Sequence, residues 1–415
     1  MKTLDIAIVG AGPAGLAAAL FLARAGHRVT IFERFDTPKP VGSGLILQPT
    51  GLAVLDQLGL LADILARGAR IDRLFGHDVG SRRIVLDARY GVSGRSGGRF
   101  GLAVHRAALF GVLHDAALRQ GIQIETATEI ADFDPSGGGG FLVDGIGRRF
   151  GRFDLAVDAS GARSPLRRRL FDVSTPVPLA YGAVWTTLDW VGGFDGHALT
   201  QAYQRASVMI GILPIGRQRP GAGDQAAFFW SLKVADHAAL LAGGLEAWKA
   251  RVRGLWPDVE PYLAQIADFD QLVLARYQHH TLTRPYGERI VAIGDCAHST
   301  SPQLGQGANM ALLDAAALTA ALAASTDLPA ALARYAGMRR LHVRTYQALS
   351  RMFTPFYQSD SHVLPFLRDR LVSTLSRIPP GPQILAGIVS GLLVDPLTPI
   401  GIEEPDWQAH HPRGR

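Results

Sequence analysis

The segment that most constrains the fold is a glycine-rich turn placed between a strand and a helix at the start of the chain. Residues 4–9 form a short apolar run, and Gly-Ala-Gly-Pro-Ala-Gly follows at residues 10–15. A helix-forming stretch covers residues 16–25, and residues 28–33 form a second strand pattern that ends in Glu33. A strand, a GxGxxG turn, a helix and a strand with a terminal acid together predict a dinucleotide-binding βαβ unit.

The residues of this unit suit dinucleotide binding for different physical reasons. Gly10 permits the tight turn, Gly12 lets a pyrophosphate approach the backbone, and Gly15 lets the helix pack close to the strand. The helix N-terminus offers free N–H groups and a positive dipole end to the phosphates. The Glu33 carboxylate suits a pair of ribose hydroxyls and would repel a 2′-phosphate, which argues against NADP in this site. Arg34, beside it, either stacks on adenine or lies in solvent.

A second glycine-rich segment lies near residue 300. Residues 289–295 form another buried-strand pattern that ends in Gly-Asp, so that Asp295 could bind a ribityl or ribose hydroxyl. Gly305 and Gly307 would let the backbone pass close to a flat ring. A helix predicted over residues 310–324 would point its N-terminal dipole at that ring and stabilise an anionic form of it.

These motifs resemble those of one known family. GAGPAG with Glu33, followed in the same order and spacing by GDCAHSTSPQLGQGAN and Asp314, looks like the class A flavin monooxygenases, the p-hydroxybenzoate hydroxylase family. The resemblance implies an α/β fold. It would comprise a discontinuous Rossmann-like FAD-binding domain, an inserted β-sheet substrate domain and a C-terminal helical segment.

The resemblance also implies roles for residues outside the two motifs. Arg106, in Val104-His-Arg-Ala-Ala-Leu109, matches a helix-start arginine that reaches the FAD, and residues 42–49 match a loop that lines the flavin. An ordinary surface arginine is the alternative for Arg106. The predicted cofactor-binding residues are Gly10, Gly12, Ala14, Gly15, Glu33, Arg34, Gly44, Arg106, Asp295, Pro302, Gly305, Gly307, Ala308 and Asn309.

The chain departs from the family pattern at Ser160-Gly161, where similar members carry Asp-Gly. In the family that aspartate helps both FAD and NAD(P)H binding. Serine keeps a hydrogen-bonding group but has no charge. We expect FAD binding to survive, and Ser160→Asp to change the rate of reduction by NAD(P)H more than the affinity for FAD.

The middle of the chain has a different pattern. Residues 179–190, 200–211 and 226–233 are strand-like and rich in aromatic side chains. In the resembling family this region roofs the substrate over the flavin. Plain core packing is the favoured alternative for any single pocket candidate. The candidates for pocket lining are Trp185, Tyr203, Met209 and Trp230.

The predicted domain boundaries follow from these patterns. The FAD-binding domain would comprise residues 1–75, 101–175 and 281–345, and the substrate domain an excursion at 76–100 and residues 176–280. Residues 346–415 would form a C-terminal helical segment that covers the pocket. Its apolar run at 384–394 is too short to span a bilayer. We favour burial of this run over a dimer contact or weak contact with a membrane surface.

The sequence gives little support for a disulfide framework, a metal site or a nucleic-acid-binding site. The single cysteine, Cys296, allows no disulfide framework, and no carboxylate–histidine cluster has metal-ligand spacing, so we expect no metal. The net charge of +6 is spread along the chain without a nucleic-acid reader motif. We interpret His298 as positional, and His279-His280 as residues on a strand surface. No secretory signal or membrane span is seen, which favours a cytoplasmic protein, as a monomer or a homodimer.

The function that the resemblance implies is FAD-dependent monooxygenation. NAD(P)H, as a transient co-substrate, and O2 would act through a flavin hydroperoxide to hydroxylate an aromatic or heteroaromatic small molecule, while the flavin carries the chemistry. An alternative enzyme is a flavin-dependent dehydrogenase or reductase on the same fold, similar to the geranylgeranyl reductases. A flavin-bearing membrane-surface binder is a less favoured alternative of another class.

Overall fold

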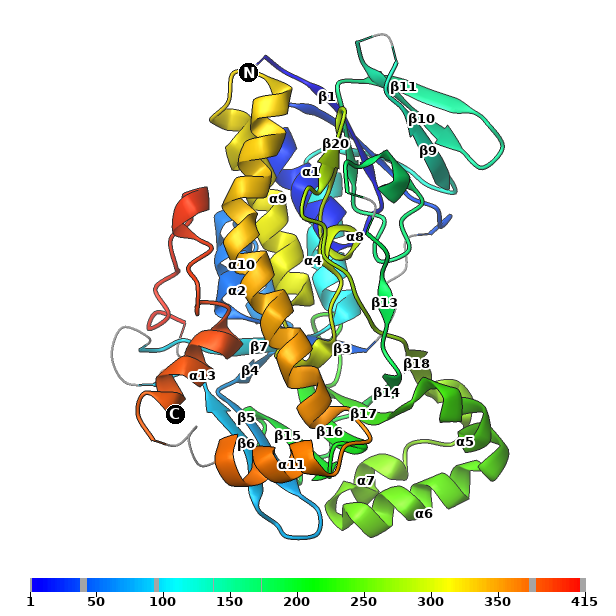
Figure 1. The fold of residues 1–415 in the computed structure, drawn as a ribbon, viewed down its shortest axis with the longest axis vertical. Helices are drawn as coiled ribbons and strands as arrows, with labels where there is room; N and C mark the ends of the chain where they lie inside the picture. Colours follow the sequence, from blue (N-terminus) through cyan, green and yellow to red (C-terminus); the bar gives the residue numbers. More distant parts are fainter. Residues whose placement is uncertain are drawn as a thin grey trace.

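The computed structural model describes residues 2–37, 43–92, 97–136, 138–172, 174–372 and 378–410. One predicted feature falls partly outside these ranges, because Gly42 of the flavin-lining loop is not among the described residues. Figure 1 shows an upper lobe of sheet and helices and a lower lobe built on a larger sheet.

The upper lobe is organised around a six-stranded sheet in the order β20-β21-β12-β1-β2-β8. β1 lies between β12 and β2 and pairs with both in parallel, so that Ile8 lies opposite Val157 on one side and Ile31 on the other. The central strand is apolar because both faces of such a sheet are covered. The bounds are β1 Asp5–Val9, β2 Arg28–Phe32, β8 Gln123–Glu125, β12 Leu155–Asp158, β20 Tyr286–Gly287 and β21 Ile290–Ala292.

Helices from distant parts of the chain cover this sheet. Helix α1 packs on α9 and α4, and α9 packs on α10, which runs along the molecule from the upper lobe to the lower one (Figure 1). The long helices contribute Ala- and Leu-rich faces to one continuous core that includes Leu16, Leu313 and Leu332. The bounds are α1 Pro13–Arg24, α2 Pro49–Gln57, α3 Leu61–Leu65, α4 Arg106–Arg119, α8 Asp295–His298, α9 Gly307–Ala323 and α10 Leu328–Tyr357.

The lower lobe is organised around a seven-stranded sheet in the order β18-β14-β17-β16-β15-β5-β6. Two of its strands come from residues 73–89, and the others from residues 181–275. This matches the predicted excursion of an early segment into the substrate domain, whereas the domain boundaries themselves remain a prediction. The bounds are β5 Arg73–Asp78, β6 Ile84–Arg89, β14 Tyr181–Asp189, β15 Ala198–Gln204, β16 Val208–Gly216, β17 Gln225–Lys233 and β18 Val273–Ala275.

The remaining elements connect or cover the two lobes. A three-stranded sheet, β3-β7-β4, lies between them, and α13 packs against β6. Smaller strands and helices complete the fold. Their bounds are β3 Gly44–Leu47, β4 Ala69–Ile71, β7 Gly101–His105, β9 Ile130–Asp134, β10 Gly140–Asp144, β11 Arg149–Phe153, β13 Val177–Pro178, β19 Gln278–His279, α5 His237–Gly243, α6 Leu245–Leu255, α7 Glu260–Leu263, α11 Val363–Leu367 and α13 Gly381–Ser390.

Two sequence-based predictions of elements were wrong in detail. The run 200–211, interpreted as one strand, is a hairpin of β15 and β16. The chain reverses near Arg205, whose φ of 57° is a left-handed turn conformation that side-chain alternation does not reveal. Helix α9 begins at Gly307, not at Met310, because glycine and alanine in its first turn carried no apolar signal.

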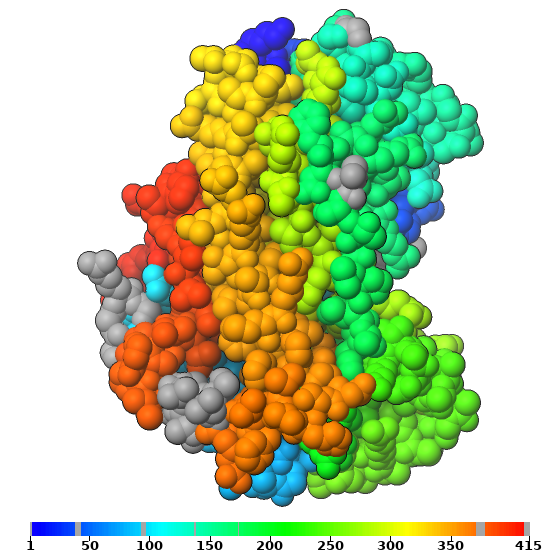
Figure 2. Space-filling model, viewed as in Figure 1, coloured from blue at the N-terminus to red at the C-terminus, as the bar shows by residue number. Residues whose placement is uncertain are grey.

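Within the described ranges, no helix is long and apolar enough to cross a membrane. The apolar run at 384–394 forms most of α13 and the turn after it. Ala386, Ile388 and Val389 are buried, as favoured from the sequence, while Ile384 remains 45% exposed. Figure 2 shows this C-terminal region flanking α10 on one face of the molecule.

Candidate active site

The first glycine-rich turn has the geometry that a pyrophosphate site requires. Gly10 has φ +106°, and a Cβ there would lie 2.6 Å from the carbonyl oxygen of Ala159. A Cβ at Gly15 would collide with the carbonyl oxygen of Gly10, so this glycine allows α1 to approach β1. Gly12 has open space where its Cβ would be, directly before the first turn of α1. That space is where a phosphate could approach the helix N-terminus.

The acid at the end of β2 is bound to the same turn. Glu33 is 8% exposed, and its Oε2 accepts a hydrogen bond from the Ala11 amide at 2.8 Å. Its Oε1 accepts from the Phe35 amide at 3.1 Å. Each carboxylate oxygen has further lone pairs, so the group can also accept from ribose hydroxyls. Arg34, by contrast, is exposed, with its guanidinium over the Phe35 ring at 4.7 Å.

The second segment turns sharply at two of its glycines. Gly294 has φ +64° and Gly305 has φ +60°, a conformation that other residues rarely adopt. Asp295 is exposed and makes no hydrogen bond or ion pair with any other described residue. Helix α9 begins at Gly307, close to this carboxylate. A Cβ built on Gly307 would lie 3.9 Å from Asp295 Oδ1. The free carboxylate and the helix N-terminus therefore face the same space.

Asn309 has a different role from the one its place in the motif suggested. Its Oδ1 accepts from the Gln48 amide at 2.8 Å, and its Nδ2 donates to the carbonyls of Ile46 and Gly305 at 3.2 and 2.9 Å. The side chain, 0% exposed, is fully used in joining α9 to the end of β3. Only its backbone N–H, in the first turn of α9, remains available to a cofactor.

Arg106 and Gly44, also predicted to bind the cofactor, have different surroundings in the structure. Arg106 is exposed at the start of α4 and makes no ion pair within the described ranges, so its guanidinium is free to reach a cofactor. A Cβ at Gly44 would lie 2.6 Å from a methyl of Ile215. Gly44 is thus required for close packing of β3 on the lower sheet, whether or not it also lines the flavin.

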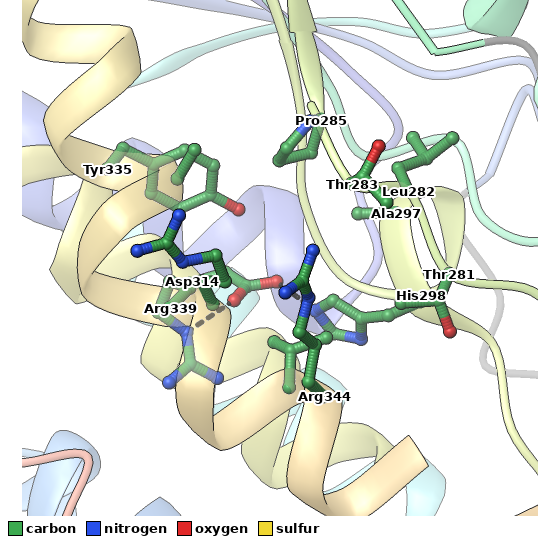
Figure 3. Close-up of a pocket in the computed structure, with 13 residues that line it drawn as sticks. Thr281, Leu282, Thr283, Pro285, Ala297, His298, Asp314, Tyr335, Arg339 and Arg344 are labelled. Atoms are coloured by element: carbon green, nitrogen blue, oxygen red, sulfur yellow. Dashed lines mark hydrogen bonds and ion pairs between the residues drawn. The ribbon is translucent and has the colours of Figure 1, made fainter. Parts of the chain in front are cut away.

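A buried ionic network holds the second segment in place. Asp314 of α9 accepts hydrogen bonds from the Gly294 amide at 2.8 Å, from His298 Nε2 at 2.6 Å and from Arg339 Nε at 2.7 Å. Burial alone would raise the pKa of Asp314, but His298 and Arg339 lower it to about 2. Figure 3 shows the three side chains meeting beside a small pocket rimmed by Arg344 and Thr283. His298 is thus a positioning residue, as its motif suggested.

Ser160, where the chain departs from the family pattern, contacts a buried carboxylate. Its Oγ donates to Asp158 Oδ1 at 2.6 Å, and Asp158 Oδ2 accepts from Ser164 Oγ and from Cys296 Sγ at 2.8 Å. Asp158 is 0% exposed, so it does not replace the missing acid at position 160. Burial and the neighbouring Asp158 raise the pKa of the Cys296 thiol well above its ordinary value, which makes this cysteine a poor nucleophile.

The four candidates for pocket lining do not all lie on the same face of the seven-stranded sheet. Trp185, Tyr203 and Met209 lie with Phe229 on the face toward the upper lobe, where the Trp185 and Phe229 ring centroids are 4.5 Å apart. Trp230 lies on the opposite face, 6.2 Å from the ring of Trp248 on α6. The prediction that Trp230 lines the pocket was therefore wrong, because alternation along β17 points it into a separate core.

Apolar side chains from three parts of the chain meet on the inner face of that sheet. They come from β3 and β7, from the sheet itself, and from α13, which contributes Val389. Gln306, in the second motif, donates to the carbonyls of Ile388 and Val389 at 3.3 and 3.1 Å. The α13 helix is thereby attached to the flavin motif and packs on one side of this apolar cluster. We name the packed side chains the inner cluster, defined by Ile46, Tyr90, Trp185, Leu199, Tyr203, Met209, Leu213, Ile215, Ala227, Phe229 and Val389.

The adjacent histidines are not on a strand surface, which corrects the sequence-based prediction. His279 is 8% exposed and pairs with Ser350 Oγ at 3.1 Å, and His280 is 2% exposed and pairs with the Ser174 carbonyl at 2.8 Å. α10 covers this strand, which local polarity could not indicate. No cluster of metal-binding side chains occurs among the described residues.

With this geometry established, comparison with known proteins identifies the family. The model of the FAD binding domain family matches residues 3–349. The chain belongs to this family. A monooxygenase is similar along nearly the whole chain: the aurachin C monooxygenase/isomerase of Stigmatella aurantiaca is 27% identical over 390 residues, which cover 91% of this chain and 96% of the relative.

Solved structures of FAD enzymes share the fold. The tetrameric form of 2-methyl-3-hydroxypyridine-5-carboxylic acid oxygenase has a TM-score of 0.78 and 21% identity, and covers 98% of this chain and 100% of its own. Klebsiella pneumoniae HpxO, in complex with FAD and uric acid, has a TM-score of 0.78 and 22% identity, with 94% and 97% covered. These likenesses confirm the α/β fold with a FAD-binding domain that the sequence predicted.

The residues of this FAD-dependent monooxygenase fit its cofactor. The open space over Gly12 and the first turn of α1 suit the pyrophosphate, and the exposed, unpaired Asp295 suits a ribityl hydroxyl. The backbone amide of Arg106 donates to the Ser43 carbonyl at 2.9 Å, which places this residue beside the start of β3. Its guanidinium has no ion-pair partner within the described ranges and is available to the cofactor. These individual contacts remain predictions, whereas FAD as the cofactor follows from the family.

Proposed function

We propose that this enzyme hydroxylates an aromatic or heteroaromatic small molecule, using NAD(P)H as electron donor and O2 as oxygen donor. In balance, the substrate C–H, O2, NAD(P)H and a proton give the hydroxylated product, NAD(P)+ and water. The observation that carries the proposal is the inner cluster, in which aromatic and aliphatic side chains of the lower sheet face the lobe that contains the flavin motifs. The solved relatives that oxidise a hydroxypyridine carboxylic acid or bind uric acid support a flat ring as substrate.

The protein groups would act by binding, orienting and excluding water. When bound, FAD supplies the redox chemistry and the transfer of oxygen. The N-terminus of α9 would stabilise negative charge on the flavin ring through its dipole and the free N–H groups of its first turn. Gly305 would allow the backbone to lie close to that ring. The apolar side chains of the inner cluster would keep water away from the reacting atoms.

The dehydrogenase alternative requires the organic substrate itself to reduce the flavin, whereas a reductase would pass electrons from the reduced flavin to its organic substrate. It draws on Ser160, because the family aspartate that assists NAD(P)H is absent. The similar aurachin C monooxygenase/isomerase and hydroxypyridine oxygenase favour oxygen transfer over this alternative.

Anaerobic stopped-flow absorbance tests the proposal. The purified FAD enzyme is mixed with NADH or NADPH, alone and with phenols, quinolones and indoles. We expect the flavin band to bleach faster in the presence of one of these aromatics, and oxygen then to yield a product heavier by one oxygen atom. Bleaching by an organic substrate in the absence of nicotinamide, with no oxygen incorporated, would instead establish the dehydrogenase.

Ser160→Asp tests the role of the departure from the family pattern. The added carboxylate would lie near Asp158, with which the native hydroxyl now bonds. We expect a changed rate of flavin reduction by NAD(P)H with little change in FAD content. Ser160→Ala is the matched control, since it removes the hydroxyl without adding charge. An unchanged rate in Ser160→Asp would show that position 160 does not govern reduction in this chain.

A further inference from the structure

A small pocket lies between α10 and the segment that joins β19 to β20 (Figure 3). The second flavin motif contributes Ala297 and His298 to its wall, but neither Asp295 nor Gly307, which face the predicted flavin site. The enclosed part has a volume of about 30 Å³, whereas one water molecule needs roughly 10–15 Å³. This volume is too small for an aromatic ring or a nucleotide. A ligand here would be a small ion or the end group of a larger molecule.

The side chains that line this pocket carry a surplus of positive charge. Helix α10 contributes Arg339, Arg340 and Arg344, whereas Asp314 is the one acid among the lining residues that the structure describes. Leaving His298 aside, three guanidinium groups and one carboxylate give a net of two positive charges. The Asp314 carboxylate already accepts from the Gly294 amide, His298 and Arg339, so it does not pair with the other two arginines. This surplus favours an anion.

Several polar groups of the pocket wall have no hydrogen-bond partner. Arg339 is 3% exposed, and its Nη1 is buried without a partner among the described residues. The same is true of Thr281 Oγ1. Arg340 and Arg344 are exposed and form no hydrogen bond or ion pair with any residue in the described ranges. A buried guanidinium N–H without a partner is costly, so acceptor oxygens would be stabilised at this position.

Helix geometry brings two of these arginines together at the mouth of the pocket. Arg340 and Arg344 are four residues apart on α10, so they lie on the same face of the helix and repel each other. Figure 3 shows Arg344 extending from α10 beside Asp314 and His298. A guanidinium group presents parallel N–H donors that match the oxygens of phosphate or carboxylate. An oxyanion between the two arginines would accept from both and remove their repulsion.

We propose that this pocket binds a tetrahedral oxyanion, phosphate or sulfate, either as the free ion or as the end group of an ester. Arg340 and Arg344 hold its outer oxygens, and Arg339 Nη1 and Thr281 Oγ1 are the donors in the wall of the enclosed part. A phosphate group carries about −1.5 to −2 charges near pH 7, which matches the surplus of the pocket. The site is separate from the pyrophosphate site at Gly12 and does not depend on the proposed reaction.

Isothermal titration calorimetry of the FAD-loaded enzyme tests this site. Inorganic phosphate, sulfate and phenyl phosphate are titrated separately in an amine buffer, with the ionic strength held constant by sodium chloride. Bound FAD occupies its own pyrophosphate site, so the probes cannot bind there. For wild type we expect saturable binding of one phosphate or sulfate per chain. Tighter binding of phenyl phosphate than of inorganic phosphate would assign the pocket to a phosphate ester, and the reverse order would assign it to the free ion.

Variants locate the binding site. Arg344→Gln and Arg340→Gln should each weaken phosphate binding at least about tenfold, the value of one hydrogen bond to a charged group, with unchanged FAD content. Arg334→Gln removes the same charge from an exposed position of α10 outside the pocket, and should retain the wild-type affinity within about twofold. Ala336→Leu fills the pocket without a change of charge and should also weaken binding. Ala333→Leu, at an exposed position of the same helix, is its control.

Three outcomes would overturn the inference. The first is a wild-type enzyme that binds neither phosphate nor sulfate above the chloride background, which would leave water as the occupant of the pocket. The second is an equal loss of affinity in Arg334→Gln and Arg344→Gln, which would assign the attraction to the overall charge of α10. The third is full binding in Ala336→Leu, which would place the anion elsewhere. Because calorimetry needs neither NAD(P)H nor an aromatic substrate, a failure of the proposed function would leave this result unaffected.

Discussion

At the scale of single residues, the predicted FAD site depends on three glycines that have no side chain. Gly10 and Gly15 have backbone oxygens where a side chain would lie, so they are fixed by the protein's own packing. Gly12 has nothing within 4 Å of its Cβ position. Its lack of a side chain is therefore explained by a ligand and not by the fold, which separates two roles that the GxGxxG pattern merges.

Gly12→Val should accordingly abolish FAD retention with little effect on folding. The valine side chain would occupy the space that the pyrophosphate needs, while no protein atom is displaced. The ratio of flavin to protein absorbance after gel filtration measures the effect. Gly254→Val, at an equally open position on exposed α6, is the control and should remain yellow. A yellow, FAD-loaded Gly12→Val protein would refute the assignment.

At the scale of elements, α10 is the part that joins the flavin motif to the C-terminal segment. Its Arg339 binds Asp314 of α9, and its His342 and Tyr346 bind the backbone of α13 and the turn that follows it. His342 Nε2 donates to the Gly391 carbonyl at 3.0 Å. The apolar helix α13 is therefore held against the inner cluster by polar contacts at both its middle and its end.

His342 should make the stability of this arrangement depend on pH. Burial, followed by the nearby Arg339, lowers the pKa of His342 to about 3 from 6.5, so the unfolded chain binds the proton more readily. Stability is thus complete above pH 6.5 and is lost as the pH falls from 6.5 toward 3. Acidification from pH 7 to 5 should cost about 2 kcal/mol.

Guanidinium unfolding at pH 7 and pH 5 measures this loss. His342→Gln, which can still donate to the Gly391 carbonyl, should reduce the difference between the two pH values. His197→Gln, at an exposed position, serves as the control and should leave the difference unchanged. An equal loss of stability in wild type and His342→Gln would show that other groups cause the acid sensitivity.

At the scale of the whole molecule, the cofactor site is assembled from stretches that are far apart in sequence. β1 and α1, the start of α4, and the β21-to-α9 segment meet at one edge of the six-stranded sheet. The lower sheet is itself joined to this region by the residue before β3, since Ser43 Oγ donates to the Thr186 carbonyl at 3.1 Å. A ligand bound at that edge therefore links segments from most of the chain.

FAD should consequently stabilise the protein as a whole. At a free concentration of about 100 times its dissociation constant, it should add about 2.7 kcal/mol to the free energy of unfolding of the apoprotein. Thermal melts of apoprotein with and without FAD measure the shift, with Gly12→Val as the variant that should show none. A shift of equal size in Gly12→Val would mean that FAD stabilises the protein from another site.

The sequence by itself determined those elements of this protein that depend on interactions within one short segment. The order of strand, turn, helix and acid predicted the βαβ unit, because GxGxxG spacing, helix dipole and terminal acid act within one short segment. The Gly294-Asp295 turn and the burial of much of the 384–394 run were expected for the same reason. Residues 76–100 were expected to belong to the substrate domain, and the strands that join the lower sheet there, β5 and β6, lie at residues 73–89.

Tertiary structure alone decided which side of each element meets which neighbour. Trp185 and Trp230 both lie in aromatic strand runs, and only sheet packing sends one toward the flavin motifs and the other toward α6. Asn309 and Gln48 are far apart in sequence, yet the Gln48 backbone amide donates to Asn309 Oδ1 and so joins α9 to the end of β3. Hydrogen bonds and burial between distant segments depend on three-dimensional placement, and no spacing along one chain encodes that placement directly.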